Sequence, residues 1–478
     1  MSRGHLRRAG GHGARPRWGR RAAAAGLAGL AGLGTAACSG GAGASPGAWD
    51  PRVLSIVHFV EKDRGLAFDH PVSVRFLAPA AFQAAVAGGD RTSPSDRKAL
   101  DEQAAELRAL GLAHGHLDLA RLESSADQSG TVGFYDSDSK NLYVEGTSMT
   151  PYVRVTVAHE LTHALQDQRL GLGHLNDLPD DQQPAVSALI EGDAVTVEQD
   201  YRNTFSAEEE RRYRSEEDAL GGGAGGASLP DFLADASNFP YDFGPAFVDS
   251  LLNDGGNGRL DGAYRRPPVS EAEVVDPTRY LSGGRPVAVP APSLPAGAKR
   301  LQPPQAYGQL SMAETLGTIL GYPAWAAVQG WRGDSSVLYD AGGRTCVAID
   351  TLLGSPAAAD TFQAAAATWA TRLGGPQVTR QGPMVGIRSC DPGTAAVPPP
   401  AVEPAVYDVL AARADLMDNI LNGPGETVTQ AQCVVDRTVD VLGPAGAVAY
   451  DQGDAGAASD GRVKTIEAAA NPACGAPK

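Results

Sequence analysis

The sequence predicts an α+β fold, on three observations. The chain has 478 residues, of which 42% are hydrophobic, so it is long enough for two or three compact units with a buried core. Short β-branched segments of strand type occur at 53–60, 72–77, 131–135 and 141–145. Longer segments, in which apolar residues recur three or four positions apart as in helices, alternate with the strands and follow them.

The sequence predicts an export signal at residues 1–37. Residues 1–37 carry seven arginines and no acidic side chain, and their apolar run is too short to span a membrane. The following Thr35-Ala36-Ala37-Cys38 resembles the lipobox of bacterial lipoproteins, with Thr35 where that pattern prefers Leu. The resemblance implies that 1–37 is a lipoprotein signal peptide, that Cys38 carries a lipid, and that the protein is held outside the cytoplasmic membrane by residues 38–50 as a flexible tether. Plain secretion is the alternative.

Helix signals follow in chain order. Ser93-Pro94 opens a helix that Gly111 closes, and the strands at 131–135 and 141–145 are expected to pair around a turn. Thr150-Pro151 supplies an N-cap and a first-turn proline for a helix that ends at Leu170. A second long helix is predicted from about Pro184 to Tyr201.

The second half of the chain predicts appended regions with disulfides. Four cysteines remain beyond Cys38, an even number that is typical of an oxidising compartment. They can pair in three ways, and nearest-neighbour pairing keeps each bridge within one segment. The predicted units are a core at 51–285, an α/β extension at 286–395 with Cys346–Cys390, a Pro-rich linker at 396–404, and a small module at 405–478 with Cys433–Cys474.

The charge of the chain excludes one class of partner. Beyond residue 37 there are 33 basic and 56 acidic side chains, a net charge of −23. Because so acidic a body repels phosphate backbones, we expect no nucleic-acid partner. Membrane contact is predicted through the N-terminal lipid alone, and no oligomeric state is predicted.

The motif that carries chemistry is His159-Glu160-Leu161-Thr162-His163, within the helix predicted at 151–170. Two histidines at positions i and i+4 lie on one helix face, so both imidazoles can bind one metal ion. Glu160 is rotated about 100° from His159, which places its carboxylate beside the ion. There it can act as a general base on water at the metal.

A catalytic zinc ion needs a third protein ligand and an open position. The metzincin continuation is absent, because Gln166 and Arg169 occupy the positions of its Gly and His. Glu191, in the next helix, is the remaining candidate, since carboxylates buried in an apolar helix are costly unless they are paired. Gly192 costs the helix about 1 kcal/mol relative to Ala, and its missing side chain lets two helices approach closely.

Together these motifs resemble the gluzincin class of zinc metallopeptidases, whose third ligand is a glutamate on a downstream helix. The 28-residue gap from His163 to Glu191 falls within that class. The resemblance implies a zincin-like (thermolysin-like) core with an active-site helix and an edge strand, one bound Zn²⁺ ion, and hydrolysis of peptide bonds. More narrowly, residues 156–168 with 191–194 resemble a group of uncharacterised bacterial exported proteins that are classed only as candidate peptidases.

The resemblance also assigns roles around the metal. Many gluzincins orient the first histidine with an Asp four residues after the ligand glutamate, where this chain has Val195, so Asp193 is the candidate for that bond. Tyr241 is the candidate donor to the developing oxyanion; the alternative, which the sequence favours, is an aromatic residue packed at the start of a helix at 245–252. The strand at 141–144 is expected to pair, as an exposed edge, with a protein or peptide substrate.

A second interpretation has the same fold but no catalytic activity. In it the chain is a catalytically inactive envelope lipoprotein of the zincin fold that binds a protein or peptide partner. The presence of Glu160 favours the enzyme, because a structural metal site has no need of a general base.

Overall fold

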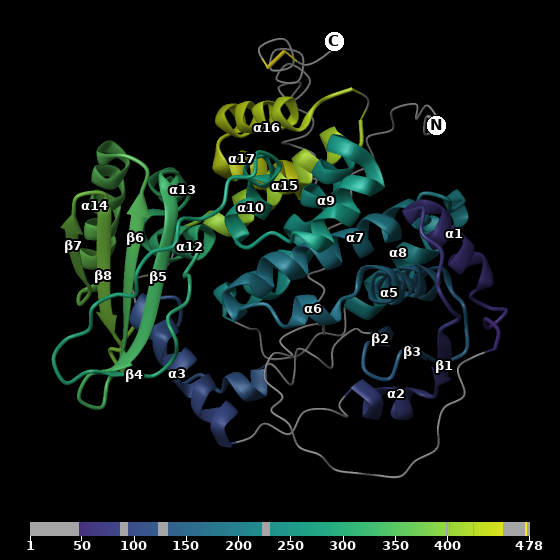
Figure 1. Ribbon diagram of the computed structural model, residues 1–478, viewed down its shortest axis with the longest axis horizontal. Helices are drawn as coiled ribbons and strands as arrows, with labels where there is room; N and C mark the ends of the chain where they lie inside the picture. The colour runs from purple at the N-terminus through teal and green to yellow at the C-terminus, as the bar shows by residue number, and fades with distance from the viewer. Residues whose placement is uncertain are drawn as a thin grey trace.

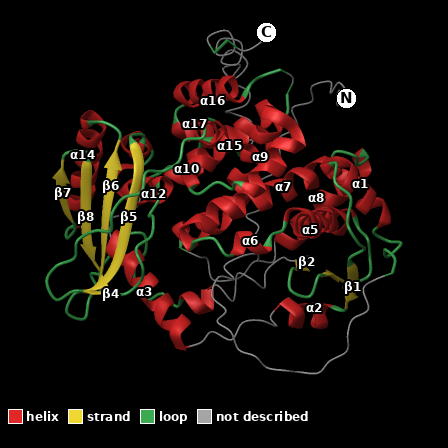
Figure 2. Cartoon of the chain, in the orientation of Figure 1, coloured by secondary structure: helices red, strands yellow, loops and turns green. Residues whose placement is uncertain are grey.

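The computed structural model describes residues 47–86, 94–122, 132–221, 230–397, 400, 402–423, 425–452 and 474–475. These residues form two β-sheets and many helices, which confirms the predicted α+β class. Figure 1 shows the larger sheet at one end of the molecule and the smaller sheet at the other, with helices between them. Figure 2 distinguishes the strands from the helices by colour. The predicted signal peptide and Cys38 lie outside the described residues.

The smaller sheet has the strand order β1-β3-β2, with β1 at Ser73–Leu77, β2 at Gly133–Asp136 and β3 at Asn141–Glu145. β3 pairs in parallel with β1 and antiparallel with β2. The exposed edge predicted at 141–144 is therefore wrong, because β3 is the central strand. The sequence marks strands but not their lateral order, and here the edge strands are β1 and β2.

Residues 53–60 form part of a helix rather than the predicted strand. Helix α1 spans Leu54–Arg64. Val53, Ile56, Val57 and Val60 are each at most 1% exposed and recur three or four positions apart, so a helix buries all four on one face. A strand would turn neighbouring residues to opposite faces. The spacing of these residues therefore outweighs their β-branched character.

Three of the helices predicted in the first half of the chain are present in the structure. Helices α3, α5 and α7 lie at the positions predicted for helices. The helix expected to start at Pro245 lies instead inside the long helix α9, which contains two prolines and has non-helical backbone angles at Gly255 and Gly256. The helices are α2 (Pro79–Val86), α3 (Pro94–Leu110), α5 (Pro151–Leu170), α6 (Gly173–Asn176), α7 (Gln183–Arg202), α8 (Ala207–Gly221), α9 (Asp231–Arg265), α10 (Glu271–Val275) and α11 (Pro277–Leu281), with a 3-10 turn at Asp180–Gln182.

The larger sheet is antiparallel throughout, in the order β4-β5-β6-β8-β7. The sulfur–sulfur distances confirm the nearest-neighbour pairing of the cysteines. Cys346 and Cys390 join β6 to β8 with an S–S distance of 2.01 Å, and Cys433 and Cys474, outside this sheet, have an S–S distance of 1.94 Å. Its strands and the helices around it are β4 (Lys299–Arg300), α12 (Gln309–Leu320), α13 (Pro323–Val328), β5 (Trp331–Asp340), β6 (Thr345–Leu353), α14 (Pro356–Leu373), β7 (Gln377–Gln381) and β8 (Met384–Cys390).

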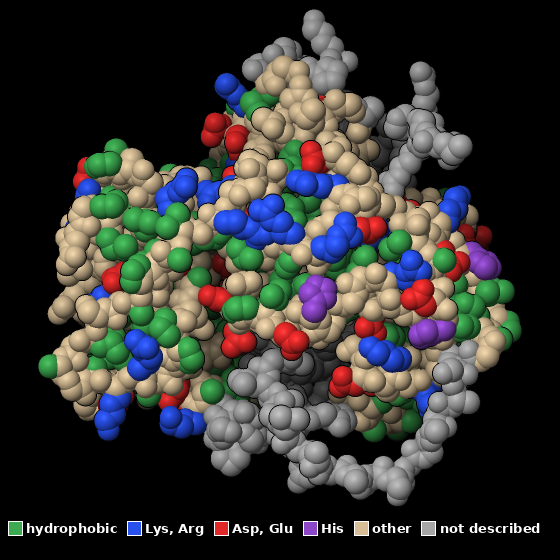
Figure 3. Space-filling model, in the orientation of Figure 1, with side chains coloured by type: hydrophobic (Ala, Val, Ile, Leu, Met, Phe, Trp, Pro, Cys, Tyr) green, Lys and Arg blue, Asp and Glu red, His purple; other side chains and the backbone are tan. Residues whose placement is uncertain are grey.

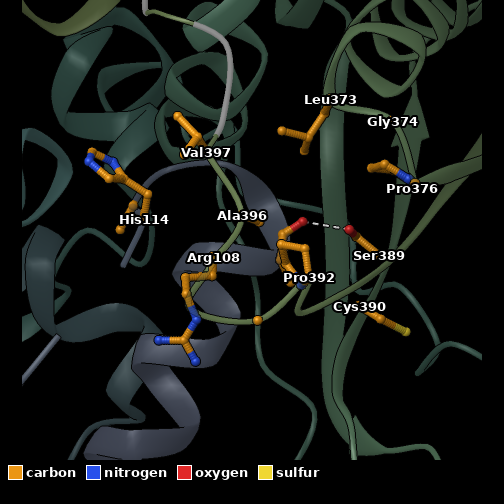
Figure 4. Close-up of a pocket in the computed structure, with 14 residues that line it drawn as sticks. Arg108, His114, Leu373, Gly374, Pro376, Ser389, Cys390, Pro392, Ala396 and Val397 are labelled. Atoms are coloured by element: carbon orange, nitrogen blue, oxygen red, sulfur yellow. Dashed lines mark hydrogen bonds between the residues drawn. The ribbon is translucent and has the colours of Figure 1, made fainter. Parts of the chain in front are cut away.

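Packing crosses the predicted boundary at residue 285. Helix α3 packs on β6 and β8 of the larger sheet. The Ser389 hydroxyl donates to the carbonyl of Ala109, and Arg108 forms an ion pair with Asp391 at 2.6 Å. Figure 4 shows this junction, where a pocket lies between α3, the end of α14 and the segment at 392–397.

The C-terminal helices also pack on the preceding core. They are α15 (Val406–Leu421), α16 (Val428–Leu442) and α17 (Pro444–Asp451). Tyr407 in α15 donates a hydrogen bond of 2.8 Å to Asp242 in α9, and Val406, Leu410 and Val435 belong to the same buried cluster as residues of α7 and α9. On the face in Figure 3, apolar, basic and acidic side chains are interspersed. No helix among the described residues is both long and apolar enough to cross a membrane.

Candidate metal centre

The predicted motif lies within helix α5, whose two ends are set by capping residues and one face of which is buried. The Thr150 side chain accepts from Val153 N, Pro151 occupies the first turn, and Gly171 ends the helix with a φ of 72°. Leu161 and Leu165 are at most 1% exposed and anchor the helix in the core. The side chains of His159 and His163 remain 12% and 13% exposed, so they lie at the edge of that core.

Helix α7 brings Glu191 to the two histidines. It crosses α9 so closely that a Cβ atom on Gly192 would lie 2.3 Å from the carbonyl carbon of Gly244. This confirms that the missing side chain of Gly192 allows two helices to approach closely, and the helix it meets is α9. This contact fixes the position of α7 against α9, and with it the position of Glu191, the residue before Gly192.

Three ligand atoms converge in space. The Nε2 atoms of His159 and His163 are 3.0 Å apart, and Glu191 Oε2 lies 3.2 Å and 3.4 Å from them. A tetrahedral zinc ion with bonds of about 2.0–2.1 Å holds its ligand atoms roughly 3.3 Å apart. The three atoms therefore have the spacing of one face of such a tetrahedron. This His159–His163–Glu191 group could hold a metal ion.

The second nitrogen of each imidazole is also engaged. His159 Nδ1 lies 3.1 Å from Glu198 Oε2, and His163 Nδ1 lies 3.0 Å from Gln166 Oε1. Because both partners accept hydrogen bonds, they hold the protons on Nδ1 and leave the Nε2 lone pairs to converge on one point. Converging lone pairs repel each other unless a cation lies between them, so this donor set fits a metal ion.

Sequence reasoning missed Glu198 and Gln166. The bond predicted from Asp193 to the first histidine is made by Glu198 instead, and Asp193 accepts from Gln166 Nε2 at 3.1 Å. The reason is helical geometry: Glu198 lies seven residues, or two turns, after Glu191 and so shares its face, whereas Asp193 is about 200° away. That seven-residue spacing is the signal that could have found Glu198.

Glu160 is positioned by the smaller sheet. Its Oε2 accepts from the backbone amide of Tyr135 in β2 at 2.8 Å. Since Tyr135 N bonds to Glu160 rather than to β3, this edge of β2 faces the motif helix. The edge strand beside the predicted site is therefore β2.

The electrostatics of the group favour a positive charge at its centre. Burial opposes protonation of His159, but the Glu191 and Glu198 carboxylates outweigh it and raise the pKa of His159 to about 10. Burial opposes the charge on Glu191 too, yet the facing imidazoles hold its pKa well below the usual range. Burial raises the pKa of Glu160, because the two histidines only partly offset it. A cation between the ligands would take the place of these protons.

Tyr241 lies in α9, half-buried and three residues before the Gly244 crossing. Its role as an oxyanion donor stays a prediction. His174, just beyond the end of α5, is not part of the metal group: its Nε2 lies 3.2 Å from the carbonyl oxygen of Tyr264. None of the residues lining the pocket in Figure 4 belongs to the candidate metal group.

Comparison with protein-family models, with curated proteins and with solved structures finds no match for this chain. The disulfide-bonded cysteine pairs are typical of an oxidising, extracytoplasmic environment.

Proposed function

We propose that the chain is a zinc-dependent peptidase that acts outside the cytoplasmic membrane, anchored there by a lipid on Cys38. His159, His163 and Glu191 hold one zinc ion, and Glu160 is the general base. The observation that carries this proposal is the set of three facing ligand atoms, 3.0–3.4 Å apart, with Glu160 on the same helix as the two histidines.

The chemistry divides between the ion and the chain. When bound, the zinc ion acts as a Lewis acid on the scissile carbonyl and lowers the pKa of water toward neutrality. Glu160 takes the proton from the attacking water and delivers it to the leaving amine. The bond from Tyr135 N holds one carboxylate oxygen of Glu160 in place, so the side chain stays oriented through both transfers.

The substrate is proposed to be an extended stretch of protein or peptide. The edge of β2 that faces the motif helix runs beside Glu160, and an extended chain laid along it brings a peptide bond next to the general base. This assigns to β2 the role expected of the strand at 141–144.

Metal content and metal dependence test the proposal. We expect the purified chain to contain one zinc ion and to cleave an unfolded protein substrate. A chelator should abolish the cleavage, and added Zn²⁺ should restore it. Elemental analysis and electrophoresis of the substrate measure both. Stoichiometric zinc without cleavage would favour the second interpretation, a partner-binding protein, and a chain free of metal would refute the ligand set.

Glu198→Ala is expected to weaken zinc binding about 10–100-fold, because His159 loses the acceptor that fixes its ring. Competition with a chromophoric chelator measures the dissociation constant. Glu273→Ala is the matched control, since Glu273 is also 1% exposed but accepts from Val269 N at 2.6 Å, apart from the metal group. Equal zinc affinity in the two variants would contradict the role given to Glu198.

A further inference from the structure

We propose that Arg64 in α1, Asp193 in α7 and Gln166 in α5 form a relay that positions His163, so that α1 determines how tightly the site holds its metal. The inference rests on the proposed function, since it concerns the metal of that site. It assigns positioning roles to three residues, none of which is a ligand.

Gln166 is the member that touches the ligand. It is 1% exposed, and its Nε2 donates to the carbonyl of Ile190 at 3.0 Å and to Asp193 Oδ2 at 3.1 Å. Because these two acceptors both face one end of the amide group, that end must be the NH₂ group. The carbonyl oxygen Oε1 therefore faces His163 Nδ1. His163 is thereby held with Nε2 toward the metal.

Asp193 holds Gln166 in that orientation. It is 1% exposed, and its Oδ2 also accepts from the Tyr264 hydroxyl at 2.8 Å. A carboxylate this deeply buried needs a counter-charge. Arg64 supplies it, with Nε at 2.7 Å from Asp193 Oδ1.

Arg64 ties the relay to a distant part of the chain. It is the last residue of α1, is 3% exposed, and also reaches Asp261 Oδ1 in α9 at 2.9 Å through its Nη2. The planar guanidinium therefore joins carboxylates from two helices, which an ammonium group could not do in the same geometry.

The end of α1 is itself fixed on α9, because Asn257 Nδ2 donates to the carbonyl of Asp63 at 3.0 Å. Helix α1 contributes no member to the His159–His163–Glu191 group. It nevertheless completes the support of His163, so a shift of α1 would remove the counter-charge of Asp193, then the acceptor of Gln166, then the orientation of the imidazole.

Two variants of the full chain test the relay: Gln166→Met and Arg64→Met. We expect each to raise the zinc dissociation constant about 10–100-fold, measured by chelator competition, and to change the visible spectrum of the Co²⁺-loaded protein. Gln309→Met is the matched control. Gln309 is likewise 1% exposed and donates to a backbone carbonyl, that of Val328 at 2.8 Å, and its loss should leave zinc affinity within twofold.

The test stays decisive if Arg64→Met does not fold, because Gln166→Met removes no charge. Zinc affinity and a cobalt spectrum in Gln166→Met that equal those of the Gln309→Met control would overturn the relay. A changed spectrum together with weakened zinc binding supports the relay. This result does not depend on whether the wild-type chain cleaves peptides, so the relay and the proposed peptidase activity can fail independently.

If the wild-type chain takes up no zinc, the proposed function fails and the relay is judged on stability alone. Urea unfolding then compares Arg64→Met, Gln166→Met and the double variant. Destabilisation of the double variant by less than the sum of the single effects supports a connected network, and additive effects overturn it.

Discussion

Glu160→Gln is expected to keep its zinc and to lose about 10²–10⁴-fold in kcat/KM for peptide hydrolysis. The amide has the size of the carboxylate and can still accept from Tyr135 N, so the position of the side chain is preserved. It cannot take a proton from the attacking water at neutral pH. The loss therefore falls on catalysis and leaves metal binding intact. Initial rates on a quenched fluorogenic peptide, with zinc content measured on the same samples, check both halves of this result.

A matched exchange of Glu for Gln controls for the loss of one negative charge. Glu209 lies in α8 and forms a partly exposed ion pair with Arg154 at 2.7 Å, outside the metal group, so Glu209→Gln should leave kcat/KM within about twofold. Equal cleavage by wild type and Glu160→Gln would remove Glu160 from the mechanism. A variant without zinc would mean that the carboxylate supports the metal instead.

Gly192→Ala is expected to destabilise the protein by about 3 kcal/mol or more, at the upper end of the range for overpacked sites. The added Cβ would lie 2.3 Å from the carbonyl carbon and oxygen of Gly244 and 2.7 Å from its Cα. All three are backbone atoms of α9, so no side-chain rotation relieves the clash and the helices must separate. Because α7 also carries Glu191, zinc affinity should fall with stability. Urea unfolding measures the first effect and chelator competition the second.

Gly258 in the same helix α9 provides the comparison. A Cβ there meets nothing within 4 Å, so Gly258→Ala should be neutral or should stabilise the helix by up to about 1 kcal/mol. Similar stability in the two alanine variants would show that the α7–α9 crossing can relax, and would contradict the constraint placed on Gly192.

The His159–His163 motif could be read from the sequence because its information is local. Thr150 and Gly171 mark the ends of α5, and helical periodicity alone places His159 and His163 on one face. Choosing Glu191 as the third ligand required a non-local inference, which rested on the cost of burying a carboxylate in an apolar helix and on the glycine beside it. The convergence of Glu191 with the histidines agrees with that inference.

The remaining features depend on contacts between segments distant in the chain. The order β1-β3-β2 is decided by which strands meet, and no single strand encodes it. Gln166 was noticed only as the wrong residue for a metzincin, since its partner Asp193 is 27 positions away. Helix α1 differs from these cases, because its signal is local. The spacing of Val53, Ile56, Val57 and Val60 indicates a helix, but the preference of β-branched residues for strands led to the prediction of a strand.

The glycine crossing also constrains motion. Where Gly192 and Gly244 bring backbone against backbone, there is no rotamer whose change could alter the spacing of α7 and α9, so the two helices shift as one body. The backbone at Glu191 then moves only together with α9. Any opening of the site by backbone movement, whether to admit an ion or to fit a bulky peptide, must come from displacement of α5 and β2 against this pair of helices.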